Sequence, residues 1–367
     1  MTGDYGLTAG PQALEGNCPS CGAPVGARDS FCESCGIELT APMVNAEPPG
    51  YQAECPVCSV DPQAAPSVIT ADGYCQSCGR KVPSGRDHSE LDLGLVAGVT
   101  DRGLRHTRNE DAMGLATADT PAGPVAIAVV CDGVSTSPRP DDASLAAIQA
   151  SVRTLLTSVR RGDDPVDASL AAVYSAYHAL TMMGSPGAAP SATYVSAVIS
   201  SHAVTVCWLG DSRAYWLSTG PDAIRLSSDD SLAEELVARG VMGEAEALAS
   251  PQAHVITRWL GADLTEPEPH VVRFEPPRPG VVLVCSDGLW NYRPEAAGLA
   301  ELALPAAFAD PLDTAAELVK FALDAGGMDN ITVVLVPFPL APFPEEPPHP
   351  KTVPVRRLAT LPRKTPP

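Results

Sequence analysis

The pattern of apolar residues changes character near residue 90. Residues 17–81 are rich in Cys, Gly and Pro and show little apolar periodicity, whereas residues 91–338 contain short apolar runs and stretches with helical spacing. Short apolar runs that are rich in β-branched residues are typical of buried strands. The predicted strands are 125–130, 191–199, 204–209, 214–217, 281–285 and 331–336.

Apolar residues spaced for one helical face predict helices over 144–161, 166–183, 231–239 and 312–325. Two of these helices have recognisable starts: Ser231 and Glu234 form a capping box, and Asp310 precedes a proline at the first helical position. The first two helices follow one another and the strands then cluster. Because this order is not the strict alternation of a doubly wound parallel sheet, we expect an α+β fold with antiparallel sheets.

The same shifts in composition predict three regions. Residues 1–89 would form a cysteine-rich module with its linker, residues 90–338 the main globular domain, and residues 339–367 a disordered, proline-rich basic tail. A chain of 367 residues is long enough for two or three domains.

Charge and hydropathy exclude several classes of protein. The net charge of −20 argues against a nucleic-acid partner, since binding to phosphate backbones needs clustered Lys and Arg. No segment approaches the roughly 20 apolar residues of a membrane helix, and the first ten residues lack the pattern of a signal peptide. We therefore expect a cytoplasmic protein with no membrane partner.

Eight of the eleven cysteines form four C-x-x-C pairs. Two such pairs can complete the tetrahedral thiolate shell of a structural zinc ion, which leaves no open position for catalysis. The alternative is a redox C-x-x-C motif, and a crossed pairing of the two groups also stays open. The spacing predicts two structural Zn²⁺ ions, with the ligands Cys18, Cys21, Cys32 and Cys35 in one group and Cys55, Cys58, Cys75 and Cys78 in the other.

This region resembles a double zinc ribbon, a type of module that binds proteins or nucleic acids. Its only cations up to residue 89 are Arg28, Arg80, Lys81 and Arg86, and acidic side chains outnumber them. Four-thiolate zinc sites add further negative charge. We therefore expect a protein partner.

Three aspartates stand where predicted strands meet loops. Asp132 follows the run 125–131 and precedes a glycine, Asp287 follows the run 281–286 and also precedes a glycine, and Asp329 precedes the last strand. Each one alone could be a turn residue. Together, carboxylates at strand ends can bind hard divalent cations, and two such ions can activate a water for attack on phosphorus.

These aspartates belong to eight segments whose order resembles that of the metal-dependent PPM family, the type-2C serine/threonine protein phosphatases. The resemblance covers about residues 91–338, the whole predicted main domain. The segments are 100–111, 130–133, 191–193, 209–213, 229–231, 257–261, 285–290 and 327–332.

The resemblance implies an antiparallel β-sandwich flanked by helices in α-β-β-α layers, with two Mn²⁺ or Mg²⁺ ions at one end. Asp132 would bridge both ions. Asp287 and Asp329 would bind one ion, and the carbonyl of Gly133 the other.

By the same resemblance, Asp111 and Glu110 would act at or just behind the second ion, and Arg213 would belong to the scaffold, paired with a buried carboxylate. The implied activity is hydrolysis of phosphoserine or phosphothreonine in a protein substrate by a metal-activated water. The alternative is a zinc-ribbon adaptor whose phosphatase domain binds phosphoproteins but turns over poorly.

Two departures from the family motivate that alternative. His106 occupies the position at which many relatives have an arginine that binds the substrate phosphate, and imidazole lacks the bidentate fork of a guanidinium. Arg105, Arg108 or Arg139 could take over that role. Val134 stands where some relatives have a histidine that could act as a general acid.

Overall fold

The computed structural model describes residues 84–340 almost completely and parts of the region before them. The described residues are 16–17, 24–25, 43–46, 55, 57–58, 68–70, 74–82, 84–185, 188–243, 246–247, 250, 255–264, 266–304 and 306–340. Cys18, Cys21, Cys32 and Cys35 lie outside this set, as do residues 341–367 of the predicted tail.

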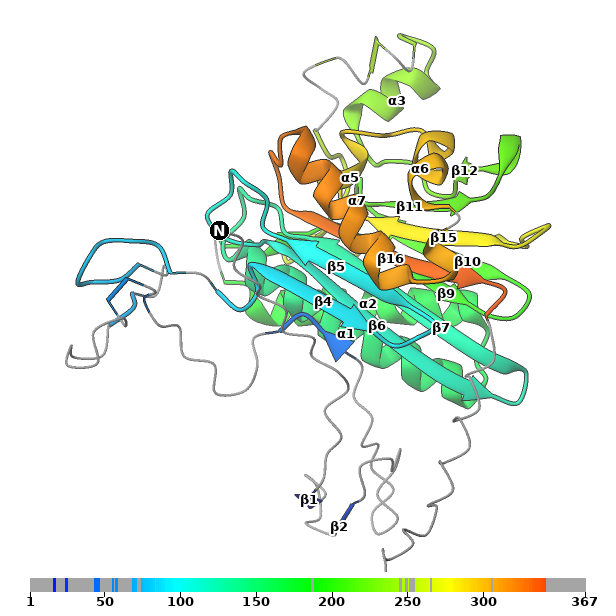
Figure 1. Ribbon diagram of the computed structural model, residues 1–367, viewed down its shortest axis with the longest axis horizontal. Coiled ribbons are helices and arrows are strands. Elements are labelled where there is room, and N and C mark those ends of the chain that lie inside the picture. Colours follow the sequence, from blue (N-terminus) through cyan, green and yellow to red (C-terminus); the bar gives the residue numbers. More distant parts are fainter. Residues whose placement is uncertain are drawn as a thin grey trace, which may run out of the picture.

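Two six-stranded antiparallel sheets form the centre of the molecule (Figure 1). The first has the order β14 (His270–Phe274), β10 (Val204–Leu209), β9 (Tyr194–Ile199), β7 (Gly123–Asp132), β6 (Asp111–Thr120) and β3 (Met43–Val44). The second has the order β12 (Ile224–Arg225), β11 (Arg213–Leu217), β15 (Gly280–Cys285), β16 (Ile331–Phe338), β5 (Ala97–Asp101) and β4 (His88–Asp92). Two small pairs join β1 (Gly16–Asn17) to β2 (Pro24–Val25), and β13 (Leu260–Gly261) to β8 (Ser191–Ala192).

Helices cover the outer face of each sheet. The first sheet packs against α1 (Pro140–Arg161) and α2 (Pro165–Met183), and the second against α5 (Asp287–Trp290), α6 (Ala296–Ala303) and α7 (Pro311–Ala325). Further helical elements in the described part of the chain include α3 (Leu232–Ala238), η1 (Gly220–Asp222) and η2 (Ala306–Phe308). No helix in the described parts combines the length and hydropathy needed to cross a bilayer.

The strands divide their side chains between three apolar layers. On β7, Ile127 and Val129 face α1 and α2, whereas Ala128 and Val130 face the other sheet, as period-2 alternation requires. A third layer lies between the second sheet and α7. The α-β-β-α architecture that the resemblance implied is therefore confirmed.

The predicted helices are present with small shifts at their starts. Asp164 caps α2, Ser231 accepts a hydrogen bond from the Glu234 amide at the start of α3, and Asp310 caps α7. The prediction of one continuous strand over 191–199 is wrong. The strand is interrupted at Thr193, whose side chain turns to accept a hydrogen bond from the Asp132 amide (3.0 Å).

Candidate metal centre and active site

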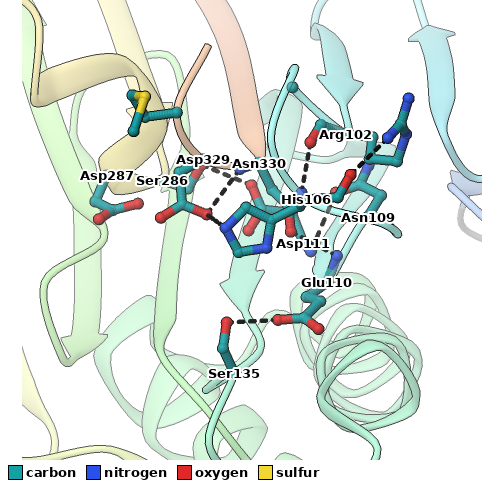
Figure 2. Close-up of polar contacts among 12 residues, drawn as sticks. Arg102, His106, Asn109, Glu110, Asp111, Ser135, Ser286, Asp287, Asp329 and Asn330 are labelled. Atoms are coloured by element: carbon teal, nitrogen blue, oxygen red, sulfur yellow. Dashed lines mark hydrogen bonds and ion pairs between the residues drawn. The ribbon is translucent and has the colours of Figure 1, made fainter.

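The ends of the central strands bring the predicted acidic residues to one edge of the sandwich. Asp132 is the last residue of β7, and its register partner is Asp111, the first residue of β6. Asp287 follows β15 and opens α5, while Asp329 lies two residues before β16. Figure 2 shows Asp111, Asp287 and Asp329 around one site.

Close backbone packing explains the two Asp-Gly sequences. A Cβ atom on Gly133 would lie 2.3 Å from the Pro140 carbonyl oxygen, and one on Gly288 would lie 2.0 Å from the carbonyl oxygen of Asn330. Neither position can hold a larger residue without moving the backbone. The glycines therefore let the loops that carry Asp132 and Asp287 approach their neighbours.

The buried carboxyl groups of the aspartates at this edge repel one another. Burial, followed by the charges of Asp111, Asp287 and Asp329, raises the pKa of Asp132 well above its usual value. Burial and neighbouring carboxylates do the same to the pKa of Asp287, and burial raises the pKa of Asp111 to about 7. A cation placed among them would lower all three pKa values.

Two oxygens in this cluster also lack a hydrogen-bond partner in the described structure. They are the buried Oδ1 atoms of Asp111 and Asp287. Buried polar atoms are usually paired, and an unpaired one points to an ion or a water at that place. Oxygen donors of this kind suit Mn²⁺ or Mg²⁺. The residues present therefore fit a divalent-metal site.

Supporting side chains fix the orientation of Asp111. Its Oδ2 atom accepts hydrogen bonds from the hydroxyls of Ser286 and Thr332, both at 2.7 Å. Ser286 comes from the end of β15 and Thr332 from β16, so both neighbouring strands of the second sheet hold a carboxylate of the first. The sequence prediction missed these two residues, since nothing local in the sequence reveals a hydrogen bond over such a separation.

Glu110 is held by two partners of its own. Arg108 Nε donates to Oε1 (2.9 Å). The Ser135 hydroxyl donates to Oε2 (2.6 Å), as Figure 2 shows. Asn330 Oδ1 accepts a hydrogen bond from the Glu110 amide at 2.7 Å, and its Nδ2 donates to the carbonyl oxygens of Arg102 and Arg108. Asn330 thus binds the 102–110 loop to the start of β16, a role that the sequence prediction also missed.

The four residues considered for the substrate phosphate differ in what they already contact. The His106 imidazole lies 3.1 Å from the Asp329 carboxylate, Arg108 pairs with Glu110 and approaches Asp141, and Arg139 donates to the Met183 carbonyl oxygen. Arg105 is exposed, and within the described part of the chain its guanidinium makes no hydrogen bond or ion pair. Arg105 is the cation of this group that stays available to an anion from solvent.

The Gly-Asp-Ser-Arg segment forms part of the scaffold. As expected, Arg213 pairs with a buried carboxylate: its Nε and Nη2 atoms donate to the two oxygens of Asp229 at 2.9 and 2.6 Å. The guanidinium also lies 3.5 Å from the centre of the Trp290 ring and donates to the Tyr215 hydroxyl. Trp290 belongs to α5, which begins at Asp287, so this network is part of the scaffold next to the acidic site.

The second cysteine group converges outside the sandwich. The Sγ atoms of Cys55, Cys58, Cys75 and Cys78 all lie within 4.8 Å of one another, and the pairs Cys55–Cys78 and Cys58–Cys75 are 3.5 and 3.8 Å apart. Sulfurs at about 2.3 Å from a tetrahedral zinc are about 3.8 Å apart. A backbone amide at Cys78 lowers the pKa of Cys75 to about 6, whereas a hydrogen bond with the Cys78 thiol raises the pKa of Cys58 to about 12.

Comparison with known proteins agrees with this arrangement. The family description "Protein phosphatase 2C" matches residues 102–321. The serine/threonine phosphatase stp of Listeria innocua is 34% identical over 146 residues, which are 39% of this chain and 55% of the relative. The match therefore spans about half the length of that curated relative.

Two solved structures have the same fold. The Mycobacterium tuberculosis serine/threonine phosphatase PstP/Ppp gives a TM-score of 0.54 at 27% identity, covering 66% of this chain and 97% of that one. The catalytic domain of the serine threonine protein phosphatase PstP in complex with two manganese ions gives 0.52 at 26% identity, covering 66% and 96%. Because the family match covers more than half of this chain, the chain belongs to the Protein phosphatase 2C family.

Proposed function

We propose that the chain is a metal-dependent protein phosphatase that hydrolyses phosphoserine or phosphothreonine. The observation that carries the proposal is the convergence of Asp111, Asp132, Asp287 and Asp329, whose mutual repulsion and unpaired oxygens call for a cation. The similarity to serine/threonine phosphatases supports the choice of reaction.

Asp132, Asp287, Asp329 and the Gly133 carbonyl would hold two Mn²⁺ or Mg²⁺ ions, with Asp111 and Glu110 in support. Such ions polarise a phosphoryl group and lower the pKa of a bound water. Water adds to phosphorus as the bond to the serine or threonine oxygen breaks, and no covalent enzyme intermediate forms. Ser286 and Thr332 keep the Asp111 carboxylate oriented.

Arg105 would bind the substrate phosphate in this scheme. It lies one residue before His106, which contacts Asp329, and its own guanidinium is exposed. A guanidinium can donate two parallel hydrogen bonds to phosphate oxygens. Val134 has no proton to give, so solvent would protonate the leaving serine or threonine oxygen.

The test is phosphate release from a phosphothreonine peptide with Mn²⁺, with EDTA as the metal-free control. The full chain is compared with Asp287→Asn, which keeps the shape of the side chain but removes its charge. We expect metal-dependent turnover in the wild type and a loss of at least a hundredfold in the variant. Absence of turnover from folded protein with bound Mn²⁺ would favour the adaptor instead.

For the cysteine groups we propose two structural zinc ions and a role in docking a protein partner. The convergence of four sulfurs supports the second zinc site, and the first is proposed from the sequence spacing. Metal thiolates persist in a reducing compartment, which supports a cytoplasmic location. We expect two zinc ions per chain by elemental analysis, and one in Cys75→Ser; a wild-type value near zero would contradict the zinc assignment.

A further inference from the structure

A short strand from the cysteine-rich region completes the edge of the first sheet. Strand β3 pairs with β6, placing Met43 opposite Leu115 and Val44 opposite Gly114. In Figure 1 it is the blue arrow beside α1 and β6. This strand comes from between the two cysteine groups and lies outside the matched family region, yet it extends the sheet of the catalytic domain.

Asn45 ends this strand with a two-point contact. Its Oδ1 atom accepts a hydrogen bond from the Met113 amide at 2.8 Å, and its backbone amide donates to the Met113 carbonyl oxygen at 3.3 Å. The residue is only 1% exposed. Met113 lies two residues after Asp111, so this contact fixes the backbone of β6 next to the metal site.

Arg86 makes a second contact with the same end of β6. Its Nη2 atom donates to the Asp111 carbonyl oxygen (3.3 Å), and its Nη1 atom donates to the Asp141 carbonyl oxygen at the start of α1 (3.0 Å). In return, Asn109 Nδ2 donates to the Arg86 carbonyl oxygen (3.1 Å). Arg86 is 9% exposed, so these bonds are largely shielded from water.

The two contacts come from opposite sides of the Cys55–Cys78 cluster. Asn45 precedes the cluster by ten residues and Arg86 follows it by eight. The cluster therefore belongs to a loop of the chain whose two ends both meet β6, at Met113 and at Asp111. Residues outside the matched family region thus contact the backbone of the strand that carries Asp111 and, one residue earlier, Glu110.

We propose that Asn45 and Arg86, which lie on either side of the Cys55–Cys78 cluster in sequence, are positioning residues for the divalent-metal site. The proposal rests on the proposed function, because it assumes that Asp111 and Glu110 support the catalytic ions. Groups that orient metal ligands commonly change metal affinity by 10- to 100-fold when they are removed. For contacts made to the backbone of a ligand, we expect the low end, about tenfold.

The experiment measures Mn²⁺ affinity by calorimetry on the full, zinc-loaded chain. Arg86→Ala and Asn45→Ala are compared with the wild type, and Arg86→Lys serves as a milder change that keeps the charge but not the two-carbonyl contact. The matched control is Arg161→Ala, which removes a 64% exposed arginine at the far end of α1. Thermal unfolding of each metal-free variant is recorded in parallel.

We expect about tenfold weaker Mn²⁺ binding in both alanine variants, an intermediate loss in Arg86→Lys, and no change in Arg161→Ala. Unchanged Mn²⁺ affinity in the folded variants would overturn the proposal, even if they unfold at lower temperature, because the contacts would then be merely structural. If the alanine variants do not fold, the Mn²⁺ affinity of Arg86→Lys is used instead: weaker binding would support the proposal, and unchanged binding would overturn it. This experiment measures Mn²⁺ binding and not phosphate release. A wild type that binds Mn²⁺ but releases no phosphate would therefore contradict the proposed function, and the roles of Asn45 and Arg86 could still be tested.

Discussion

The buried ion pair Arg213–Asp229 tests whether a scaffold residue contributes to stability without contributing to metal binding. We consider Arg213→Met, which keeps an apolar stem over Trp290 but removes the charge. Both side chains are nearly inaccessible, at 2% and 5% exposure, and two short hydrogen bonds join them. The variant would leave the Asp229 carboxylate buried without this partner.

Breaking a buried ion pair in this way costs about 3–5 kcal/mol. For a domain of this size, each kcal/mol lowers the melting temperature by about 2–4 °C, so we expect a fall of about 10 °C. Replacing both partners with apolar residues is often close to neutral, so the double variant Arg213→Met with Asp229→Leu is expected to recover most of the loss. The exposed pair Arg239–Glu235 is the control, since Arg239→Ala is expected to cost about 0.3–0.5 kcal/mol.

The assay is urea unfolding of the metal-free protein, followed by tryptophan fluorescence. Mn²⁺ affinity is measured separately at a temperature at which each variant is folded. We expect stability to fall and the affinity of the folded protein to change little. A loss below 1 kcal/mol in Arg213→Met, or a double variant less stable than the single one, would refute this reasoning.

Three further predictions concern the metal site and the binding of the substrate phosphate. The pKa of Asp111 is raised from 3.8 to about 7 in the metal-free fold. Protonated Asp111 therefore stabilises the metal-free fold, and this stabilisation is lost as the pH rises through 7. Ions bind the deprotonated form, so the gain in melting temperature from Mn²⁺ over EDTA should grow between pH 5 and about 8; a gain independent of pH would contradict the assignment. Arg105→Ala is expected to raise the KM for a phosphopeptide about tenfold or more. Arg108→Ala is expected to weaken Mn²⁺ binding, because Arg108 holds the Glu110 carboxylate. If Arg108→Ala raised the KM and Arg105→Ala weakened Mn²⁺ binding, the two roles would be exchanged.

The sequence predicted the architecture well where apolar residues dominate the strands. The runs that became β7, β10 and β15 are rich in Val, Ile, Leu and Cys. Strand β6 was missed because it contains several Ala, Gly and Asp residues, which are depleted in strands. Its small residues have a reason in three dimensions: a Cβ atom on Gly114 would lie 2.5 Å from Ile148 of α1.

The candidate site shows the same limit. Asp132, Asp287 and Asp329 could be found because each lies near the end of a predicted strand, beside a glycine or a turn, whereas Asp111 and Glu110 came only from the resemblance to the PPM family. The partners of Asp111 could not, because Ser286 and Thr332 are 175 and 221 residues away in sequence. Nor could the contacts of Asn45 and Arg86, which depend on how a segment outside the family region folds back on β6.

The most direct test of the account is a calorimetric titration of Mn²⁺ into zinc-loaded protein whose catalytic site has been stripped of divalent ions. The carboxylate arrangement predicts two ions per chain in the wild type and a loss of binding in Asp132→Asn, the residue expected to bridge both. As a matched control, Arg161→Ala should still bind two ions. A wild type that binds no Mn²⁺, or an Asp132→Asn variant that binds it as well as the wild type, would contradict the assignment of this edge of the sandwich as a two-metal centre.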